Sequence, residues 1–183
     1  MKILLIGDTH GKLNKFRDIL PKITAVDLIA HTGDYEADAA KIHEETSIPV
    51  VSVKGNCDGG YSSEDFRIIE TEFGNILLTH GHMENVKSGL TGLMYKAMEN
   101  GCAAAFFGHT HVSLTDEWKG IRFVNPGSLT LPRDGSDGSY AIVRTSRDSF
   151  DASIVYYSTV MGSGNKKPGS GYIKRLLNYS DRF

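Results

Sequence analysis

The first 55 residues alternate between short apolar runs and amphipathic segments, and this order constrains the fold more than any other feature. The runs KILLIG (2–7), DLIAHTG (27–33) and PVVSVKG (49–55) each end in glycine, which is typical of buried strands. Between them, KLNKFRDIL (12–20) and EADAAKIHEET (36–46) have the residue spacing of helices. A β-α-β-α-β order predicts a sheet with helices packed against it.

The pattern changes after residue 60, where strands outnumber helices. FRIIETEFGNILLTHG (66–81) predicts a hairpin with its turn at Gly74 and Asn75. We expect a third helix over 86–100, ended by Gly101, and then strands joined by turns rich in Gly, Asp and Pro. The predicted fold is α/β, with two mixed β-sheets packed face to face and helices outside, a four-layer α-β-β-α sandwich. The late strands would form much of the second sheet.

The chain has 183 residues, enough for one domain with a sizeable core, which we place at 1–160. Residues 161–183 are predicted to form a flexible basic tail with room for a short helix at 172–179. Five Lys and Arg residues face one Asp there, after a linker-like stretch rich in Gly, Ser and Lys. The alternative is a docking element for a partner or a second subunit, as in a homo-oligomer.

The overall composition excludes several classes of function. A formal net charge of −2 provides no basic field, so we expect no stable binding to nucleic acid. Two cysteines make neither a disulfide framework nor a thiolate zinc site. The apolar start is too short for a signal peptide, and no run is long enough to cross a bilayer. We therefore expect a cytoplasmic protein without a membrane partner.

Five short polar blocks follow apolar runs: GDTHG (7–11), TGDYE (32–36), GNCD (55–58), THGH (79–82) and GHTH (108–111). Each therefore begins at the carboxyl end of a strand, where open α/β sheets place their ligand sites. The blocks hold five of the seven histidines, and Asp, Asn and His bind metals through oxygen or nitrogen. Coincidence is a weaker explanation of the whole set than a metal site.

The spacing within the blocks supports the metal interpretation. Asp8 and His10 are two residues apart, as are His109 and His111, and alternate side chains of an extended segment point the same way. Seven candidate ligands are too many for one tetrahedral metal and suit two metals that share a carboxylate. The candidates are Asp8, His10, Asp34, Asn56, His80, His109 and His111.

This ordered set of blocks resembles the calcineurin-like metallophosphoesterase superfamily. The superfamily pattern is Asp-x-His, Gly-Asp, Gly-Asn-His-(Asp/Glu), His and Gly-His-x-His, and the match covers roughly the first two thirds of the chain. FVNPGSLTLPR (123–133) is similar to the Asn-Pro-Gly-Ser segment of its small bacterial and archaeal phosphodiesterase branch. The resemblance implies two divalent metal ions, with Mn first among Mn, Fe, Zn, Ni and Co.

The resemblance also implies how the ligands divide. One metal would be held by Asp8, His10, Asp34 and His111. The other would be held by Asp34, Asn56, His80 and His109, with Asp34 bridging. Two close metals neutralise phosphoester oxygens and acidify a bridging water, so the implied enzyme hydrolyses phosphoesters without a catalytic residue outside the metal ligands.

Cys57 departs from the pattern, because much of the superfamily has histidine there. A thiol replaces an imidazolium poorly at neutral pH, which puts monoesterase activity in doubt. The small phosphodiesterase branch also carries cysteine, so we expect a small organic phosphodiester as substrate. The alternative is a non-catalytic scaffold of the same fold, like the retromer subunit of this branch, which lacks a competent metal site. The complete ligand set favours the enzyme.

Other residues are assigned to the surroundings of the metals. His82 and Arg133 are expected to contact substrate, with a plain loop histidine and a surface arginine as the alternatives. His31, Cys57 and Asp58 are expected to lie around the ligands and to orient them. For His31 the alternative is a structural histidine at a strand end.

Overall fold

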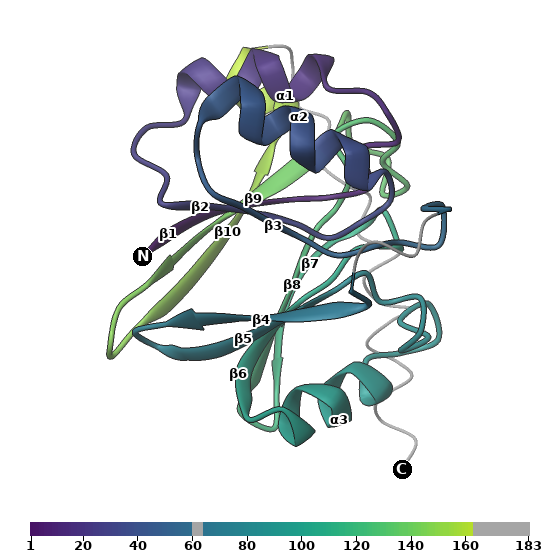
Figure 1. Ribbon diagram of the computed structural model, residues 1–183, viewed down its shortest axis with the longest axis vertical. Helices are drawn as coiled ribbons and strands as arrows, with labels where there is room; N and C mark the ends of the chain where they lie inside the picture. The colour runs from purple at the N-terminus through teal and green to yellow at the C-terminus, as the bar shows by residue number, and fades with distance from the viewer. Residues whose placement is uncertain (60–63, 163–183) are drawn as a thin grey trace.

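Two five-stranded sheets lie face to face in the computed structural model, which describes residues 1–59 and 64–162 (Figure 1). The first sheet has the order β10 (Phe150–Tyr156), β9 (Ser139–Thr145), β1 (Lys2–Ile6), β2 (Leu28–His31) and β3 (Val50–Ser52). The second has the order β4 (Phe66–Thr71), β5 (Gly74–Thr79), β6 (Cys102–Phe106), β8 (Ile121–Pro126) and β7 (Ser113–Trp118).

Both sheets are mixed, as predicted. In the first sheet, β1 to β3 are parallel, and β9 pairs antiparallel with both β1 and β10. In the second sheet, β5, β6 and β8 are parallel, and the hairpin partners β4 and β7 run against them at the two edges. The parallel strands of each sheet direct their carboxyl ends to one side, which places the loops that follow them together.

Helices cover the outer face of each sheet, which confirms the four-layer arrangement. The helices are α1 (Asn14–Ile19), the 3-10 turn η1 (Leu20–Lys22), α2 (Glu36–Thr46), α3 (Thr91–Glu99) and α4 (Tyr157–Met161). In Figure 1, α1 and α2 lie above the first sheet, and α3 lies below the second. No helix within the described ranges is both long and apolar enough to cross a membrane.

The core has three parts because the central strands are buried on both faces. Ile3 and Leu5 of β1 point between the sheets, where they meet side chains of the second sheet. Leu4 and Ile6 point the other way and pack beneath α1 and α2. Since neither face of β1 reaches solvent from Ile3 to Ile6, these positions are all apolar instead of alternating.

The strand pairing differs from the prediction in one respect. β9 and β10 do not join the second sheet; they extend the first sheet beyond β1, with Ile3 paired to Val143. The reason is burial, because β9 is almost wholly buried and can occupy an inner position between two neighbours. Strand pairing between distant segments is not visible in local sequence.

Two local boundaries also differ. The hairpin turns at Glu72 and Phe73, and Gly74 already pairs with Thr71. Tertiary contacts hold this turn, since the Phe73 ring lies 5.4 Å from the Phe150 ring and Glu72 binds the amino terminus at 3.2 Å.

The third helix is shorter than expected and begins at Thr91 instead of residue 86. The segment before it is held in turns, in which the N–H of buried Val86 donates to the carbonyl of Gly81 (3.2 Å). Gly101 follows the helix in the left-handed region, with φ +64, as its predicted role requires. Of the predicted tail, Met161 and Gly162 end α4, and residues 163–183 lie outside the described part of the chain.

Candidate metal centre

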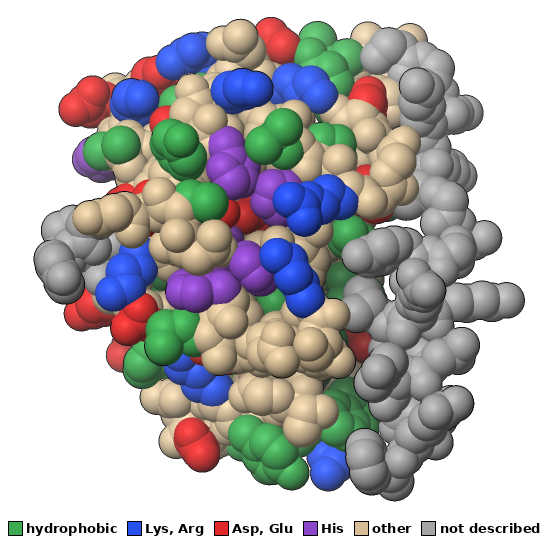
Figure 2. Space-filling view, turned by 90° about the vertical axis from the view of Figure 1, so that its right-hand side faces the viewer, with side chains coloured by type: hydrophobic (Ala, Val, Ile, Leu, Met, Phe, Trp, Pro, Cys, Tyr) green, Lys and Arg blue, Asp and Glu red, His purple; other side chains and the backbone are tan. Residues whose placement is uncertain are grey.

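The seven predicted ligands come from loops at the carboxyl ends of five strands. Asp8 and His10 follow β1, Asp34 follows β2, and Asn56 follows β3. His80 follows β5, and the pair His109 and His111 follows β6. Figure 2 shows a group of histidine side chains at the centre of one face of the molecule, with Lys and Arg side chains beside it.

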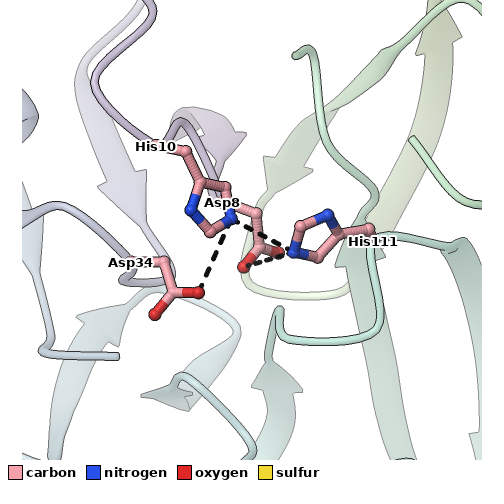
Figure 3. A group of neighbouring side chains, drawn as sticks. All are labelled: Asp8, His10, Asp34 and His111. Carbon is pink, nitrogen blue, oxygen red and sulfur yellow. Dashed lines mark hydrogen bonds and ion pairs between the residues drawn. The ribbon is translucent and has the colours of Figure 1, made fainter. Parts of the chain in front are cut away.

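Asp8, His10, Asp34 and His111 form a group that could hold a metal ion. Each offers one ligand atom, and these atoms lie within 4.8 Å of one another (Figure 3). His10 Nε2 is 3.6 Å from Asp34 Oδ2 and 3.3 Å from His111 Nε2. His111 Nε2 is 3.5 Å from Asp8 Oδ1. The group is the same set that the superfamily pattern assigns to one metal.

A second group centres on His80. Its Nε2 lies 3.1 Å from Asn56 Oδ1, 3.2 Å from His109 Nδ1 and 3.5 Å from Asp34 Oδ1. Asp34 therefore presents Oδ2 to His10 in the first group and Oδ1 to His80 in the second. This is the placement that a carboxylate shared by two metals requires.

Five of the seven candidate ligands have backbone in the left-handed region, which the expectation of extended pairs did not foresee. The φ values are +51, +50, +56, +67 and +57 for Asp8, His10, Asp34, His109 and His111. Extended alternation is therefore wrong as the reason why each pair converges; tight left-handed turns bring the side chains together. Asp and His tolerate this region better than most residues, but each still costs about 1–2 kcal/mol. Clustered backbone strain is typical of functional sites.

Backbone carbonyls fix the protonation of two histidines. His80 Nδ1–H donates to the carbonyl of Thr32 (2.8 Å), and His111 Nδ1–H donates to the carbonyl of Leu131 (2.7 Å). Because a carbonyl can only accept, Nε2 of each ring carries a lone pair that points into the centre. Burial lowers the pKa of both rings, so both are neutral at neutral pH.

The donor set fits a bound cation. The lone pair of His80 Nε2 faces the oxygens of Asn56 and Asp34, and neither side has a proton to share. Lone pairs converging at these distances repel one another unless a cation lies between them. For His109, burial and then the charge of His80 lower the pKa to about 4, so this ring too is a neutral donor.

The two buried carboxylates, Asp8 and Asp34, have pKa values shifted in opposite directions. Burial raises the pKa of Asp8 well above its usual range, and the charge of Asp34 adds to this. Burial acts to raise the pKa of Asp34. The electrostatic effect of His80 and the hydrogen bond from the Cys57 N–H (3.0 Å) outweigh burial, so the pKa of Asp34 is lowered. A divalent cation placed between two buried carboxylates and neutral imidazoles would favour the charged form of both carboxylates.

The Asn-Pro-Gly-Ser segment (125–128) at the end of β8 holds the ligand loops in place. The Asn125 side chain donates to the carbonyl of Gly108 (3.0 Å) and to Thr110 Oγ1 (3.1 Å). The Ser128 hydroxyl donates to the carbonyl of Asp8 (2.9 Å). The segment thus connects the loop after β1 with the loop after β6, although it contributes no ligand itself.

Asp58 connects two other ligand loops. Its Oδ1 accepts the N–H groups of Tyr35 (2.9 Å) and Glu36 (2.8 Å) at the start of α2, and its Oδ2 accepts the N–H of Gly55 (2.8 Å). The carboxylate therefore fixes the loop of Asp34 against the loop of Asn56. This is the position around the ligands that the sequence interpretation gave it.

His31 belongs to a buried chain of hydrogen bonds that the sequence only partly indicates. Gly33 N–H donates to His31 Nδ1 (3.2 Å), and His31 Nε2–H donates to Thr9 Oγ1 (3.1 Å). Thr9 Oγ1 in turn donates to Asp38 Oδ2 (2.8 Å), which also accepts the N–H of Gly11 (2.8 Å). The chain joins the loop of Asp8 and His10 to the start of α2.

Asp38 was missed because an acid in the first turn of a helix is ordinarily solvent-exposed. In the structure it is fully buried, and Lys41 Nζ lies 3.4 Å from its Oδ1. Nothing in the spacing of the sequence indicates that this carboxylate points inward.

Cys57 is exposed and lies against two of the candidate ligands, Asn56 and Asp34. Its Sγ accepts a hydrogen bond from Asn56 Nδ2 (3.4 Å). Burial, the hydrogen bond to Asp34 and the Asp34 charge raise the pKa of the thiol. The backbone N–H of Cys57, which contacts Asp34, is what this residue contributes to the geometry.

The residues predicted to contact substrate lie beside the two groups. The His82 ring is 5.2 Å from the His80 ring, and its buried Nδ1 has no hydrogen-bond partner within the described residues. Arg133 is exposed, and its N–H donates to the carbonyl of His111 (2.9 Å).

Sequence reasoning missed Lys87. After burial, the charge of Asp34 and the hydrogen bond from His109, the positive charges of Lys87 and Arg133 both act to lower the pKa of Asp8. Lys87 also acts on the pKa of His109, after burial and the charge of His80, and Arg133 acts on that of His111, after burial and other neighbours. No local pattern distinguishes Lys87 from any other surface lysine.

The fold and the clustered side chains define a class: an α/β sandwich protein able to hold a metal ion at the carboxyl ends of its strands. A family model described as the calcineurin-like phosphoesterase superfamily domain matches residues 1–148. The probable metallophosphoesterase YsnB of Bacillus subtilis is 35% identical over 158 residues, which span 86% of this chain and 90% of that protein. The chain therefore belongs to the calcineurin-like phosphoesterase superfamily.

Two further comparisons agree with this placement. The phosphodiesterase YfcE of Escherichia coli is 25% identical over 167 residues, covering 78% of this chain and 87% of YfcE. A crystal structure of a predicted phosphoesterase from Streptococcus pneumoniae superposes with a TM-score of 0.74 at 27% identity, over 86% of this chain and 90% of that one. The predicted family and fold are both confirmed.

Proposed function

We propose that this protein is a phosphodiesterase that uses two divalent metal ions, Mn²⁺ first among them, to hydrolyse small organic phosphodiesters. The observation that carries the proposal is the placement of Asp34, whose two oxygens face two separate groups of neutral imidazole and oxygen ligands. Asp8, His10 and His111 would complete one metal site, and Asn56, His80 and His109 the other.

When bound, the two metals supply Lewis acidity to the phosphoryl oxygens and acidify a water molecule. The residues of the chain do the rest. The carbonyls of Thr32 and Leu131 keep the lone pairs of His80 and His111 directed inward. Lys87 and Arg133 provide positive charge beside the phosphate. In the reaction, the water oxygen attacks phosphorus, the bond from phosphorus to one alcohol oxygen breaks, and the alcohol leaves with a proton.

Three observations support diesters over monoesters. The thiol at position 57 has a raised pKa and contacts Asn56, so it is a weak proton donor for a poor leaving group. A diester also carries less charge than a monoester and depends less on a protein acid. Finally, the relative YfcE is named a phosphodiesterase. The alternative of a non-catalytic scaffold has less support. A protein that binds no metal would not require lone pairs that converge on one point, or candidate ligand residues with backbone in the left-handed region.

The test is hydrolysis of bis(p-nitrophenyl) phosphate by metal-stripped protein, with and without Mn²⁺, together with metal content by mass spectrometry. We expect two metals per chain and activity only with metal. Asp34→Asn should lose most of both, whereas Asp148→Asn, an exposed carboxylate in the turn between β9 and β10, should lose neither. A folded protein that is inactive with Mn²⁺, Fe²⁺, Zn²⁺, Ni²⁺ and Co²⁺ would contradict the proposal, as would faster hydrolysis of p-nitrophenyl phosphate.

A further inference from the structure

Tyr35 lies at the mouth of the metal centre, directly after the shared carboxylate Asp34. Its ring meets the ring of His10 edge to face, with centroids 5.7 Å apart and an interplanar angle of 61°. The ring also lies over Gly11, where an added Cβ atom would sit 3.5 Å from Cε1. The side chain nevertheless remains 44% exposed. One face of an aromatic ring is therefore presented to solvent next to the candidate ligands.

The backbone of Tyr35 is strained, with φ +78. Bulky side chains are rare in this region, where glycine or asparagine is the usual choice. The hydrogen bonds of Tyr35 within the described residues are both made by its backbone: its N–H donates to Asp58 Oδ1 and its carbonyl accepts the N–H of Asp38. Asparagine would make both equally well. The phenol has no partner there. Neither burial nor hydrogen bonding explains an aromatic residue at this position, and unexplained strain of this kind points to function.

Two other exposed apolar residues lie in the loops next to candidate site residues. Leu131, 42% exposed, accepts the His111 Nδ1–H with its carbonyl, and Met83, 65% exposed, follows His82. Figure 2 shows hydrophobic side chains beside the histidine group. A site that binds only inorganic phosphate would gain nothing from exposed apolar side chains at its border. A phosphoester with an apolar, flat substituent would use the metals for its phosphate and the border for its organic part.

We propose that Tyr35 is a specificity residue, which stacks on an aryl group or nucleobase of the phosphoester bound at the metal centre. The inference rests on the proposed function and names the class of substrate. Stacking on one tyrosine face tolerates any flat group, so Tyr35 selects for an aromatic substituent and not for a particular base.

The test is calorimetric binding of phenylphosphonate and methylphosphonate to the Mn²⁺-loaded protein. The two probes have the same anionic head and differ in one aryl group, and neither is turned over. We expect phenylphosphonate to bind about five- to twentyfold more tightly to the wild type and to Tyr35→Phe. Tyr35→Asn, which suits the left-handed backbone, should bind both probes equally. Tyr95→Gln, at an exposed tyrosine on α3, should keep the wild-type preference.

The outcomes separate the two proposals. If neither probe binds in the presence of metal, the proposed function fails. If both bind to the wild type with equal affinity, or if Tyr35→Asn keeps the preference, the role of Tyr35 is refuted while the metal site stands. Adenosine 5′-phosphate against ribose 5-phosphate repeats the comparison with a nucleobase. A larger dependence on Tyr35 for this pair than for the phosphonates would identify a nucleoside as the group bound, and a smaller one a simple aryl group.

A stability measurement excludes a purely structural role. In metal-free protein, Tyr35→Asn should unfold at the same urea concentration as the wild type or at a higher one, because the backbone strain is relieved. A strongly destabilised variant would show that the ring is needed for folding, and would overturn the argument.

Discussion

Asp38→Ala is the substitution that most directly tests how the metal loops are positioned. Asp38 Oδ2 accepts two hydrogen bonds of 2.8 Å, from Thr9 Oγ1 and from the N–H of Gly11. These donors flank His10 and follow Asp8 directly. Alanine removes the acceptor of both, which leaves the buried Thr9 hydroxyl without an acceptor and the loop at Gly11 without its anchor.

The cost can be worked from the structure. Hydrogen bonds to a charged acceptor contribute about 1.5–3 kcal/mol each, and relief of the burial of the Asp38 carboxylate offsets part of the loss. We therefore expect the metal-free protein to lose about 2–4 kcal/mol of its free energy of unfolding. Loss of partners that orient ligands typically weakens metal binding about 10- to 100-fold, and we expect Mn²⁺ affinity to fall within this range.

The assays are urea unfolding in the presence of a chelator and calorimetric titration with Mn²⁺. Asp38→Asn is the conservative variant, since its amide oxygen can accept both bonds, and it should retain Mn²⁺ affinity within about threefold. Asp27→Ala is the control, because exposed Asp27 also accepts a backbone N–H, that of Lys2 (2.6 Å), but far from the metal loops. If Asp38→Ala bound Mn²⁺ as tightly as the wild type, the hydrogen bonds would not position the ligands and the reasoning would be refuted.

Three other predictions concern strain, pH and charge. Because His10 has φ +50, His10→Gly should be more stable than His10→Ala by about 0.5–1 kcal/mol in metal-free urea unfolding, and equal midpoints would disprove the strain. Burial lowers the pKa of His31 from 6.5 to about 4, so its contribution to stability is complete above pH 6.5 and is lost as the pH falls towards 4. The loss of stability of the metal-free protein from pH 7 to pH 5 should therefore be about 2 kcal/mol smaller in His31→Gln, and an identical loss would contradict this. Lys87→Gln and Arg133→Gln should each raise KM for bis(p-nitrophenyl) phosphate about three- to tenfold. Lys119→Gln, in the distant turn between β7 and β8, is the control and should leave KM unchanged. If KM were unchanged in Lys87→Gln and Arg133→Gln as well, these two residues would have no role in substrate binding.

The sequence by itself determined the layers of the fold and the identity of the candidate ligands. Strands buried on both faces have to be apolar throughout, so β1, β2 and β6 are visible as continuous runs. Parallel strands end on one side of a sheet, so the polar blocks that follow them have to meet. Both inferences depend on regularities that lie within a few residues, such as an apolar run followed directly by a polar block.

Only the tertiary structure decided the remainder, because it depends on contacts between distant segments. The place of β9 beside β1 follows from pairing across more than a hundred residues, and the turn at Phe73 from a ring contact with Phe150. Whether a polar side chain points inward or outward is equally a property of the packed molecule. Asp38 reads in the sequence as an ordinary acid in the first turn of a helix, but in the structure it is buried. Tyr35 reads as a residue next to a ligand, but in the structure its ring is exposed and its backbone is strained. The local sequence supplies the chemical groups, and long-range packing sets the direction and burial of each one.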